Sequence, residues 1–313
     1  MDPPGGRRCE AVVAMIAPAA AGRGHGRVGH AVLDPSVDGS AEVRSDGSGG
    51  GMDSGRAWCA CVPSPVPAAE ESVMTVMHGG ELASAFDHAA TLYDRMVAAN
   101  PGYHAHLRRS ARRLGMHAGG GGMRLLDLGC GTGASTAALL TAAPRARITA
   151  VDSSAGMLQV AAGKRWGPGV TFLHAPAERL AEAGAAGPFD AVFAAYLFRN
   201  VADPDLVLDR VRDTMAPGGR IAIHEYTLSG RTRHRAVWTA VCRGLLLPVG
   251  QLAGDRPLYE HLWRSVLAFD TAGAFAARMR GAGFTHVRVL PLPGWQTGVA
   301  HTFVARAPAG RRV

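Results

Sequence analysis

The chain has 313 residues, of which 47% are hydrophobic, with five cysteines and a formal net charge of +8. This composition fits one large globular domain or two small ones, the cysteine spacing fits neither a zinc site nor a disulfide framework, and no apolar stretch could span a bilayer. The positive charge comes without a basic block or interleaved aromatic residues, so we expect a reduced cytoplasmic protein with no metal and no nucleic-acid partner.

Residues 1–73 are rich in Gly, Pro, Ser and Ala and show no sustained apolar period. This composition predicts a disordered, low-complexity extension. Met74 and Met77 come just before the first helical pattern, so either is a candidate start of translation. Our hypothesis is that the upstream part is dispensable or is never made, and that residues 74–313 form the working domain.

From Glu81 onward the apolar residues follow a helical period. They predict a first helix through Leu82, Phe86, Ala89 and Tyr93, and a second helix at about residues 104–114. A glycine-rich linker, residues 115–122, separates these helices from the remainder of the chain.

The run Leu125–Leu128 predicts a short buried strand that ends in a glycine turn. Gly129, Gly131 and Gly133 let the backbone turn tightly and approach a ligand closely, and a helix is predicted from Ala134. A strand, a glycine turn and a helix start together form a nucleotide-type binding corner.

Two acidic residues indicate which ligand this corner binds. Asp127 stands at the end of the first strand, where it would repel a pyrophosphate but attract a cation. Asp152 follows the next apolar run, where a carboxylate can accept both ribose hydroxyls. A ligand with a ribose, a positive charge and no phosphate is S-adenosylmethionine (SAM). NAD is the alternative, because the glycines alone also satisfy the dinucleotide pattern.

Strands and helices alternate from here on. Strands are predicted at 147–151, 170–174, 190–194, 220–224, 287–290 and 299–305, and helices from 155, at 204–215 and at 271–281, with a mostly helical insert at about 232–264. This alternation predicts an α/β, Rossmann-like sheet of seven mostly parallel strands with helices on both faces. The short turn between the last two strands predicts an antiparallel C-terminal hairpin.

Four segments of this chain resemble the UbiE/MenG family of class I SAM-dependent methyltransferases, which C-methylate quinone-ring precursors. They are Phe86–Asp94 with His104 downstream, Leu126–Gly133, Phe198–Asp203, and Met215–Arg220 with Glu225, and a weaker match covers Pro248–Ser265. The resemblance extends from about residue 82 to the end. It implies SAM as methyl donor, an N-terminal helical lid and an apolar small-molecule acceptor, and it leaves the oligomeric state open.

The residues expected to contact SAM are Tyr93, Asp127, Gly129, Gly131, Thr132, Gly133, Asp152, Met157, Ala177 and Ala195. Asp127 would orient the ammonium group, Thr132 would bond the methionine part, and Asp152 would hold the ribose. Pro176 and Ala195 stand where the family usually has polar residues, so adenine recognition is expected from backbone groups and Met157. The alternative for Asp152 is a helix N-cap, and for Tyr93 ordinary helix packing.

On the acceptor side the resemblance implies Arg199 with Asn200, acting through water on a phenol of the substrate. The alternative for Arg199 is a structural salt bridge. His224 is a second candidate base, with a core histidine as its alternative. Strand alternation predicts that His224 and Tyr226 share one face of the sheet and that Glu225 lies on the other.

Three functions remain open at this stage: a C-methyltransferase on an apolar phenolic or quinol-like molecule, a methyltransferase acting on oxygen or another atom, and a SAM-binding protein without turnover. The segment 231–248 adds a basic cluster that leads into an apolar helix. It fits either a cover over an apolar pocket or a peripheral membrane contact.

Overall fold

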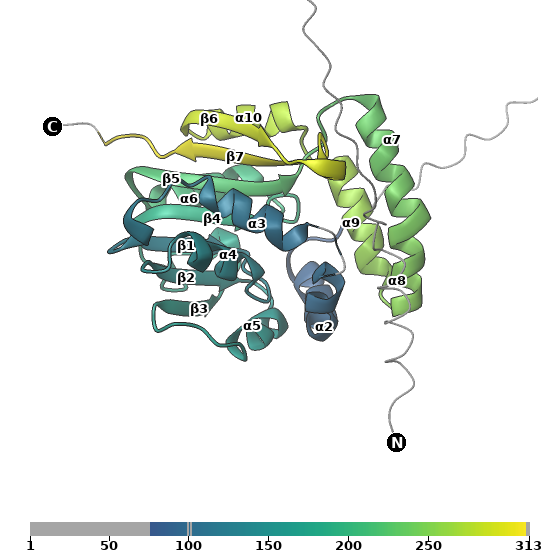
Figure 1. The fold of residues 1–313 in the computed structure, drawn as a ribbon, viewed down its shortest axis with the longest axis horizontal. Helices are drawn as coiled ribbons and strands as arrows, with labels where there is room; N and C mark the ends of the chain where they lie inside the picture. Colours follow the sequence, from purple (N-terminus) through teal and green to yellow (C-terminus); the bar gives the residue numbers. More distant parts are fainter. Residues whose placement is uncertain (1–75, 99, 101, 311–313) are drawn as a thin grey trace, which may run out of the picture. The chain divides into compact units, whose positions relative to one another are not determined.

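The computed structural model describes residues 76–98, 100 and 102–310. Its centre is a seven-stranded sheet in the order β3-β2-β1-β4-β5-β7-β6 (Figure 1). The strands are β1 (Arg124–Leu128), β2 (Arg147–Asp152), β3 (Val170–His174), β4 (Phe189–Ala195), β5 (Met215–Tyr226), β6 (Thr285–Pro291) and β7 (Ala300–Arg306). The disordered extension predicted for residues 1–73 lies outside the described residues.

Neighbouring strands from β3 to β5 pair in parallel, whereas β7 runs antiparallel to both β5 and β6. The predicted mostly parallel sheet with an antiparallel C-terminal hairpin is therefore confirmed. One boundary differs clearly, because β5 begins at Met215 rather than at Arg220. Met215 already pairs with Phe189, and the register shifts between Phe189 and Ala191, so residues 216–219 lie inside an irregular strand.

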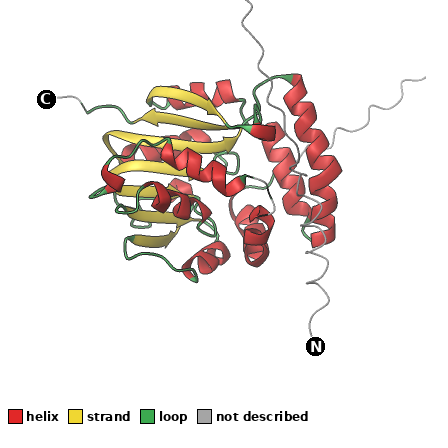
Figure 2. Cartoon of the chain, in the orientation of Figure 1, coloured by secondary structure: helices red, strands yellow, loops and turns green. Residues whose placement is uncertain are grey.

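Helices cover both faces of this sheet (Figure 2). On one face, α6 (Pro204–Thr214) and α10 (Ala272–Gly281) bury Val207, Phe275 and Met279 against the strands. On the other face, α3 (Tyr103–Arg112) and α4 (Ala134–Ala142) bury Leu107 and Leu139. The strands supply both layers because successive side chains alternate between the faces.

The first of the described helices stands over the carboxyl ends of the first strands, and the second lies along a face of the sheet. Helix α2 (Gly79–Ala98) contacts α5 (Ala155–Ala162), and α3 packs along α4. Short 3₁₀ turns lie between the other elements at Ala118–Gly120, Ala177–Arg179 and Gly294–Gln296. Since parallel sheets bind ligands at their carboxyl edge, α2 is placed as a lid over that edge.

The insert between β5 and α10 is helical, as predicted. It consists of α7 (Thr232–Val241), a π-helical stretch (Cys242–Leu246), α8 (Leu247–Ala253) and α9 (Arg256–Ala268). Trp238 on α7 is buried, and its ring lies 5.2 Å from the ring of Tyr226. The insert therefore covers the end of β5, as the pocket-cover interpretation requires. Within the described residues, no helix has the length and apolar character needed to cross a membrane.

Candidate functional site

The glycine turn after β1 has the geometry that its sequence predicts. Gly129, Gly131 and Gly133 all have positive φ angles, which L side chains rarely adopt. A Cβ atom at Gly133 would lie 2.6 Å from the Trp166 ring, so that position is closed by packing. A Cβ atom at Gly131 would meet nothing within 4 Å, so this part of the backbone faces open space.

Asp152 ties this turn to the next strand. Its Oδ2 accepts a hydrogen bond from the Gly131 N–H at 2.7 Å, and its Oδ1 accepts one from the Ser154 N–H at 2.9 Å. The N-cap of α5 is Ser154, whose side chain accepts from the Met157 N–H. The helix-cap alternative for Asp152 is therefore wrong, because the cap lies two residues later.

Asp127 is fully buried beneath the turn. Its Oδ2 accepts hydrogen bonds from Ser135 at 2.8 Å and Thr136 at 2.6 Å, while its Oδ1 has no partner among the described residues. Burial raises the pKa of this carboxyl to about 7. A cation at the unpaired oxygen would stabilise the ionised form, and the ammonium group of SAM is such a cation.

A cavity lies above the turn, and half of the predicted SAM residues line it. Its lining includes Tyr93, Gly129, Gly131, Thr132 and Ala195 from the prediction, and adds Tyr103, Leu107, Cys130, Ala134 and Ser135. Tyr103 and Leu107 come from α3. No sequence motif marks them, and only the packing of α3 over the turn identifies them.

The other predicted SAM residues lie beside or beneath this cavity. Asp127, Gly133 and Asp152 support the turn from below, through the contacts given above. Met157 on α5 and Ala177 in the 3₁₀ turn after β3 are buried, and neither lines the cavity. Their assignment to the adenine remains a prediction.

The lid helix α2 is tied down by two aspartates that the sequence analysis did not assign. Asp94 accepts a hydrogen bond from the Thr132 hydroxyl at 2.6 Å and pairs with Lys164 at 2.6 Å. Asp87 accepts from Ser154 Oγ at 2.5 Å and from the Gly156 N–H at 2.8 Å. Asp94 thus joins the lid to the rim of the cavity, and Asp87 joins it to the start of α5.

On the acceptor side, Arg199 forms the buried ion pair that the sequence analysis gave as an alternative. Its Nη1 lies 2.6 Å from Glu225 Oε1 and donates to the Tyr196 carbonyl at 3.0 Å. The guanidinium also stands 5.5 and 5.6 Å from the ring centres of Tyr196 and Tyr226. Its Nε has no partner among the described residues, so this N–H is free for a ligand.

Asn200 is held between two elements. Its Nδ2 donates to the Tyr196 carbonyl at 2.9 Å, and its Oδ1 lies 3.0 Å from Nε2 of His261 on α9. Burial lowers the pKa of His261 to about 4, so this ring is neutral near neutral pH and donates to Asn200. Asn200 is thereby oriented by the insert.

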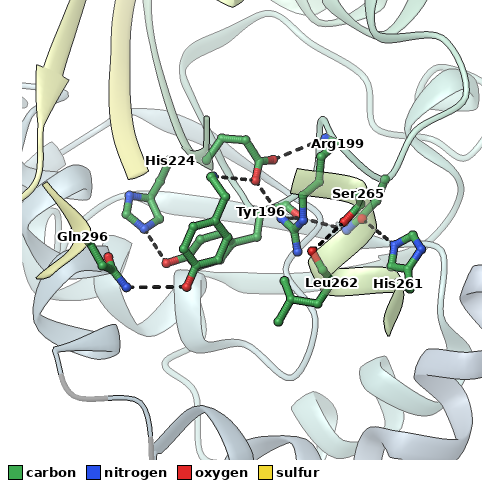
Figure 3. Close-up of polar contacts among 10 residues, drawn as sticks. Tyr196, Arg199, His224, His261, Leu262, Ser265 and Gln296 are labelled. Atoms are coloured by element: carbon green, nitrogen blue, oxygen red, sulfur yellow. Dashed lines mark hydrogen bonds and ion pairs between the residues drawn. The ribbon is translucent and has the colours of Figure 1, made fainter. Parts of the chain in front are cut away.

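His224 lies in the core, as the alternative for this residue predicted. It is fully buried, with Nδ1 3.0 Å from Ser110 Oγ. Its Nε2 lies 2.8 Å from the Tyr196 hydroxyl (Figure 3). Burial lowers its pKa to about 3, so the ring stays neutral. His224 and Tyr226 both contact Tyr196, and Glu225 pairs with Arg199, so the alternation predicted along β5 stays a prediction.

Aromatic rings form a continuous cluster next to the cavity. Tyr103 stacks on Tyr196 at 5.6 Å, Tyr196 stacks on Tyr226 at 4.7 Å, and Tyr226 packs against Trp238. Since Tyr103 also lines the cavity, the aromatic surface runs from the glycine turn to the insert. The sequence analysis did not assign Tyr103 and Tyr196, although each stands next to a residue that it named, His104 and Ala195.

Comparison with known proteins gives a consistent result. A model of the ubiE/COQ5 methyltransferase family matches residues 74–305. The UbiE ubiquinone/menaquinone biosynthesis C-methyltransferase of Syntrophotalea carbinolica is 33% identical over 214 residues, which cover 67% of this chain and 88% of that protein. The demethylmenaquinone methyltransferase of Clavibacter sepedonicus is 33% identical over 237 residues, covering 74% and 92%.

Solved structures share the fold. A SAM-dependent methyltransferase of Thermotoga maritima superposes with a TM-score of 0.52 at 16% identity, covering 72% of this chain and 99% of that chain. At this identity the likeness concerns the arrangement of the sheet and helices alone.

Replacing Asp152 with alanine should weaken SAM binding by roughly ten- to a hundredfold, because one or two charge-assisted hydrogen bonds are worth about 1.5–3 kcal/mol each. Calorimetric titration measures this. The matched control is Asp190→Ala, since Asp190 accepts a backbone N–H from Arg124 at the opposite edge of the sheet. Equal SAM affinity in the two variants would contradict the role of Asp152.

SAM binding at about pH 6 should release close to one proton from Asp127. The free carboxyl, with a pKa of about 7, is mostly protonated at that pH, and a nearby ammonium group favours its ionised form. Calorimetry in two buffers that differ in ionisation enthalpy measures the released proton. The Asp127→Asn variant should release none, and an equal release from this variant would assign the proton to another group.

Proposed function

The chain belongs to the ubiE/COQ5 methyltransferase family and is a SAM-dependent methyltransferase, and on that premise we propose that it C-methylates an apolar, quinol-like phenol in quinone biosynthesis. The observation that carries this proposal is the aromatic cluster that adjoins the cavity over the glycine turn. Stacked tyrosines offer flat, mostly apolar surfaces to an aromatic ring, while their hydroxyls can meet its oxygens. The named activities of the relatives support the same substrate class.

In the proposed reaction, SAM supplies a methyl group on a positively charged sulfur. A ring carbon next to an ionised phenol oxygen forms the new C–C bond as the C–S bond breaks, and the electron pair of that bond stays on sulfur. The phenol proton leaves to water before the transfer, the hydrogen of the methylated carbon leaves as a proton after it, and the product phenolate takes one proton back from water. The protein contributes alignment and the exclusion of bulk water from the site.

The SAM side of the site is assigned to the supports of the glycine turn. Asp127, with its unpaired oxygen, receives the ammonium group. Asp152 receives the ribose hydroxyls while it holds Gly131, and the bare backbone of Gly131 faces the ligand. Met157 and Ala177 take the adenine, on the resemblance alone.

Arg199 and Asn200 are assigned to the phenol oxygen. The free Nε of Arg199 stabilises the oxygen anion or a water beside it, while Nη1 stays on Glu225. Asn200 is the second polar group, fixed by His261. With a pKa of about 3, His224 is too weakly basic to take the proton by itself, so we assign it to the support of Tyr196.

The product test uses SAM and a reduced, demethylated quinone in detergent. We expect a product heavier by one CH₂ group, with NMR showing the new methyl group on a ring carbon, and equimolar demethylated SAM. A methyl group on oxygen would favour the O-methyltransferase alternative. Absence of any turnover with quinols would reject the substrate class.

In the same assay, Arg199→Lys should lower kcat by roughly a hundredfold with little change in SAM affinity, because the lysine retains the charge beside Glu225 but loses the second N–H. We choose lysine because alanine would leave Glu225 as an unpaired buried charge, at a cost of about 3–5 kcal/mol in stability. Arg212→Lys is the matched control, since Arg212 forms surface ion pairs on α6. A lysine variant with full kcat would remove Arg199 from the mechanism.

The segment 231–248 is assigned a second role in contact with an anionic membrane surface. Arg231, Arg233 and Arg235 are exposed, and the helices that follow expose Val237 and Leu245 at 46% and 37%. Arginines beside exposed apolar side chains suit an interface of anionic headgroups and acyl chains. A lipid-tailed quinol would reach the site from such a surface.

Anionic liposomes should sediment the protein at low salt and release it as the salt concentration rises. The triple variant Arg231→Gln, Arg233→Gln, Arg235→Gln should lose this binding and retain SAM affinity. The matched control changes Arg108, Arg109 and Arg112 to Gln, because these arginines are exposed on α3. Equal losses in both variants would indicate general charge attraction, and no sedimentation of the unaltered protein would leave the insert as a cover alone.

A further inference from the structure

Asn200 is the middle of a short series of hydrogen bonds that joins Arg199 to His261. The Tyr196 carbonyl accepts from Arg199 Nη1 at 3.0 Å and from Asn200 Nδ2 at 2.9 Å. Because a carbonyl oxygen can only accept, the amide of Asn200 turns its NH₂ group to Tyr196, and its Oδ1 lies 3.0 Å from His261 Nε2. The guanidinium and the imidazole are therefore linked through one carbonyl and one amide.

These contacts fix where the His261 ring carries its hydrogen. Asn200 Oδ1 has no hydrogen to give, so His261 Nε2 carries one and donates it. Burial lowers the pKa of His261 to about 4, so the ring is neutral near neutral pH and its Nδ1 carries no hydrogen. Nδ1 is thus a hydrogen-bond acceptor. It has no partner among the described residues, although His261 is only 4% exposed.

Arg199 offers the opposite kind of atom. Its Nη1 is engaged by Glu225 and the Tyr196 carbonyl, whereas the N–H at Nε has no partner in the part of the chain that the structure describes. Arg199 is 9% exposed, so this donor is shielded from water. A buried donor or acceptor without a partner is costly, because it has lost its hydration and gained nothing in return. Two neighbouring side chains thus carry one unsatisfied donor and one unsatisfied acceptor.

A cavity of about 230 Å³, which we call the second cavity, opens next to these side chains, and it is larger than the cavity of about 40 Å³ over the glycine turn. Arg199 lines it from the loop after β4, and Ser265 lines it from α9. His261 precedes Ser265 by one helical turn, so both stand on the same face of α9 (Figure 3). The apolar part of the lining includes Val76, Phe198, Val201, Pro204 and Phe269.

The loop after β4 borders both cavities. Ala195 lines the cavity over the glycine turn and Arg199 lines the second cavity, and four residues of chain span at most about 14 Å even when fully extended. Asp270 and Arg278, which also line the second cavity, pair with each other at 2.7 Å. A ligand in the second cavity therefore lies close to the SAM turn and beside the free Nε of Arg199.

We propose that the second cavity binds the aromatic ring of the methyl acceptor, and that Arg199 Nε and His261 Nδ1 together bind one hydroxyl group on that ring. The hydroxyl oxygen accepts from Nε, and the hydroxyl hydrogen is donated to Nδ1. His261 is thereby a binding residue that determines specificity. This inference rests on the proposed function and refines it, because it names the chemical form in which the acceptor enters the site.

A hydroxyl group is the form of oxygen that satisfies both atoms. A ketone or quinone oxygen can only accept, so it would meet Arg199 Nε but set its own lone pair against that of His261 Nδ1. A carboxylate has the same defect, and an ammonium group can only donate, so it would leave Nε unpaired. Sites of this kind reject such analogues strongly, because a buried polar group is then left without a partner.

The same pair distinguishes the two oxidation states of a quinone. The oxidised ring carries carbonyl oxygens, and the reduced ring carries hydroxyls in their place. Only the reduced ring has an electron-rich carbon for the methyl group, so the oxidised form would occupy the site without reacting. His261 therefore selects the reactive form at the binding step.

The test compares two probes on the full chain saturated with S-adenosylhomocysteine. The first, 1-naphthol, carries an aromatic hydroxyl, whereas 1-methoxynaphthalene keeps the ring and the oxygen but, like a quinone, can only accept. The titration is made near pH 7, where an ordinary phenol, with a pKa of about 10, is not ionised. By calorimetry we expect the unaltered protein to bind 1-naphthol roughly tenfold or more tightly than 1-methoxynaphthalene, because the second probe leaves a buried acceptor unpaired.

Two substitutions separate the two nitrogens of His261. In His261→Gln the amide nitrogen takes the place of Nε2 and keeps the bond to Asn200, but nothing replaces Nδ1. In His261→Asn the amide oxygen takes the place of Nδ1. Because the extra methyl group of 1-methoxynaphthalene has the same size throughout, the ratio of the two affinities is compared between variants. We expect this ratio to fall severalfold, toward one, in His261→Gln and to persist in His261→Asn.

Two further variants serve as controls. His174→Gln should keep the ratio of the unaltered protein, because His174 Nε2 also lies 3.0 Å from a carbonyl oxygen, that of Ser153, but stands on β3. Ala268→Trp narrows the second cavity at its exposed rim and should weaken both probes severalfold. The affinity for S-adenosylhomocysteine should stay the same in all four variants, which shows that each one folds.

An unchanged ratio in His261→Gln would overturn the proposal, as would a ratio near one in the unaltered protein or the failure of both probes to bind. Full binding of both probes by Ala268→Trp would place them outside the second cavity and would overturn that assignment. No methyl transfer enters the readout. A protein that shows the expected ratios but methylates no quinol would therefore reject the proposed function and leave the hydroxyl site standing.

Discussion

The buried ion pair between Arg199 and Glu225 is the interaction on which the acceptor side of the molecule depends. Two charges removed from water are tolerated when they pair with each other and further hydrogen bonds satisfy them. Glu225 meets this requirement with the Arg199 guanidinium and with the backbone N–H groups of Arg199 and Tyr226. These contacts join the loop after β4 to the end of β5. They also hold the guanidinium against the faces of Tyr196 and Tyr226, so one pair fixes both the charge and the aromatic surface beside it.

The donor side uses its carboxylates differently. Asp152 holds the glycine turn by its backbone, and Asp127 lies beneath the turn with one oxygen unpaired. An unpaired buried oxygen is costly, because it has lost its hydration without gaining a partner. Burial therefore raises the pKa of Asp127 to about 7, and a cation bound beside the unpaired oxygen would lower this pKa again. The two sides of the site thus differ: the carboxylate of Glu225 has all its hydrogen bonds, whereas the carboxyl of Asp127 has one oxygen without a partner.

The fold followed from the sequence more completely than the site did. Alternating apolar runs and glycine turns are local signals, and they located the strands of the sheet, including the C-terminal hairpin, to within a few residues except at the start of β5. The SAM turn was found for the same reason, since Asp127, Gly131 and Asp152 lie near one another in sequence. The tyrosine stack was not found, because Tyr103, Tyr196 and Tyr226 come from three distant elements. Ser110 and Thr302 are 192 residues apart, and no periodicity reports such a contact.

The contacts that hold the lid helix α2 in place are weak ones at the surface. Asp94 and Lys164 have side chains that are 42% and 36% exposed, and exposed ion pairs of this kind contribute at most about 1 kcal/mol and are screened by salt. The Asp94 bond to Thr132 joins the lid to the rim of the cavity, so any movement of α2 away from the glycine turn breaks it. Contacts this weak allow α2 to open and close readily. The lid is therefore joined to the SAM turn partly through a surface ion pair, which added salt weakens far more than it weakens the buried pair of Arg199 and Glu225.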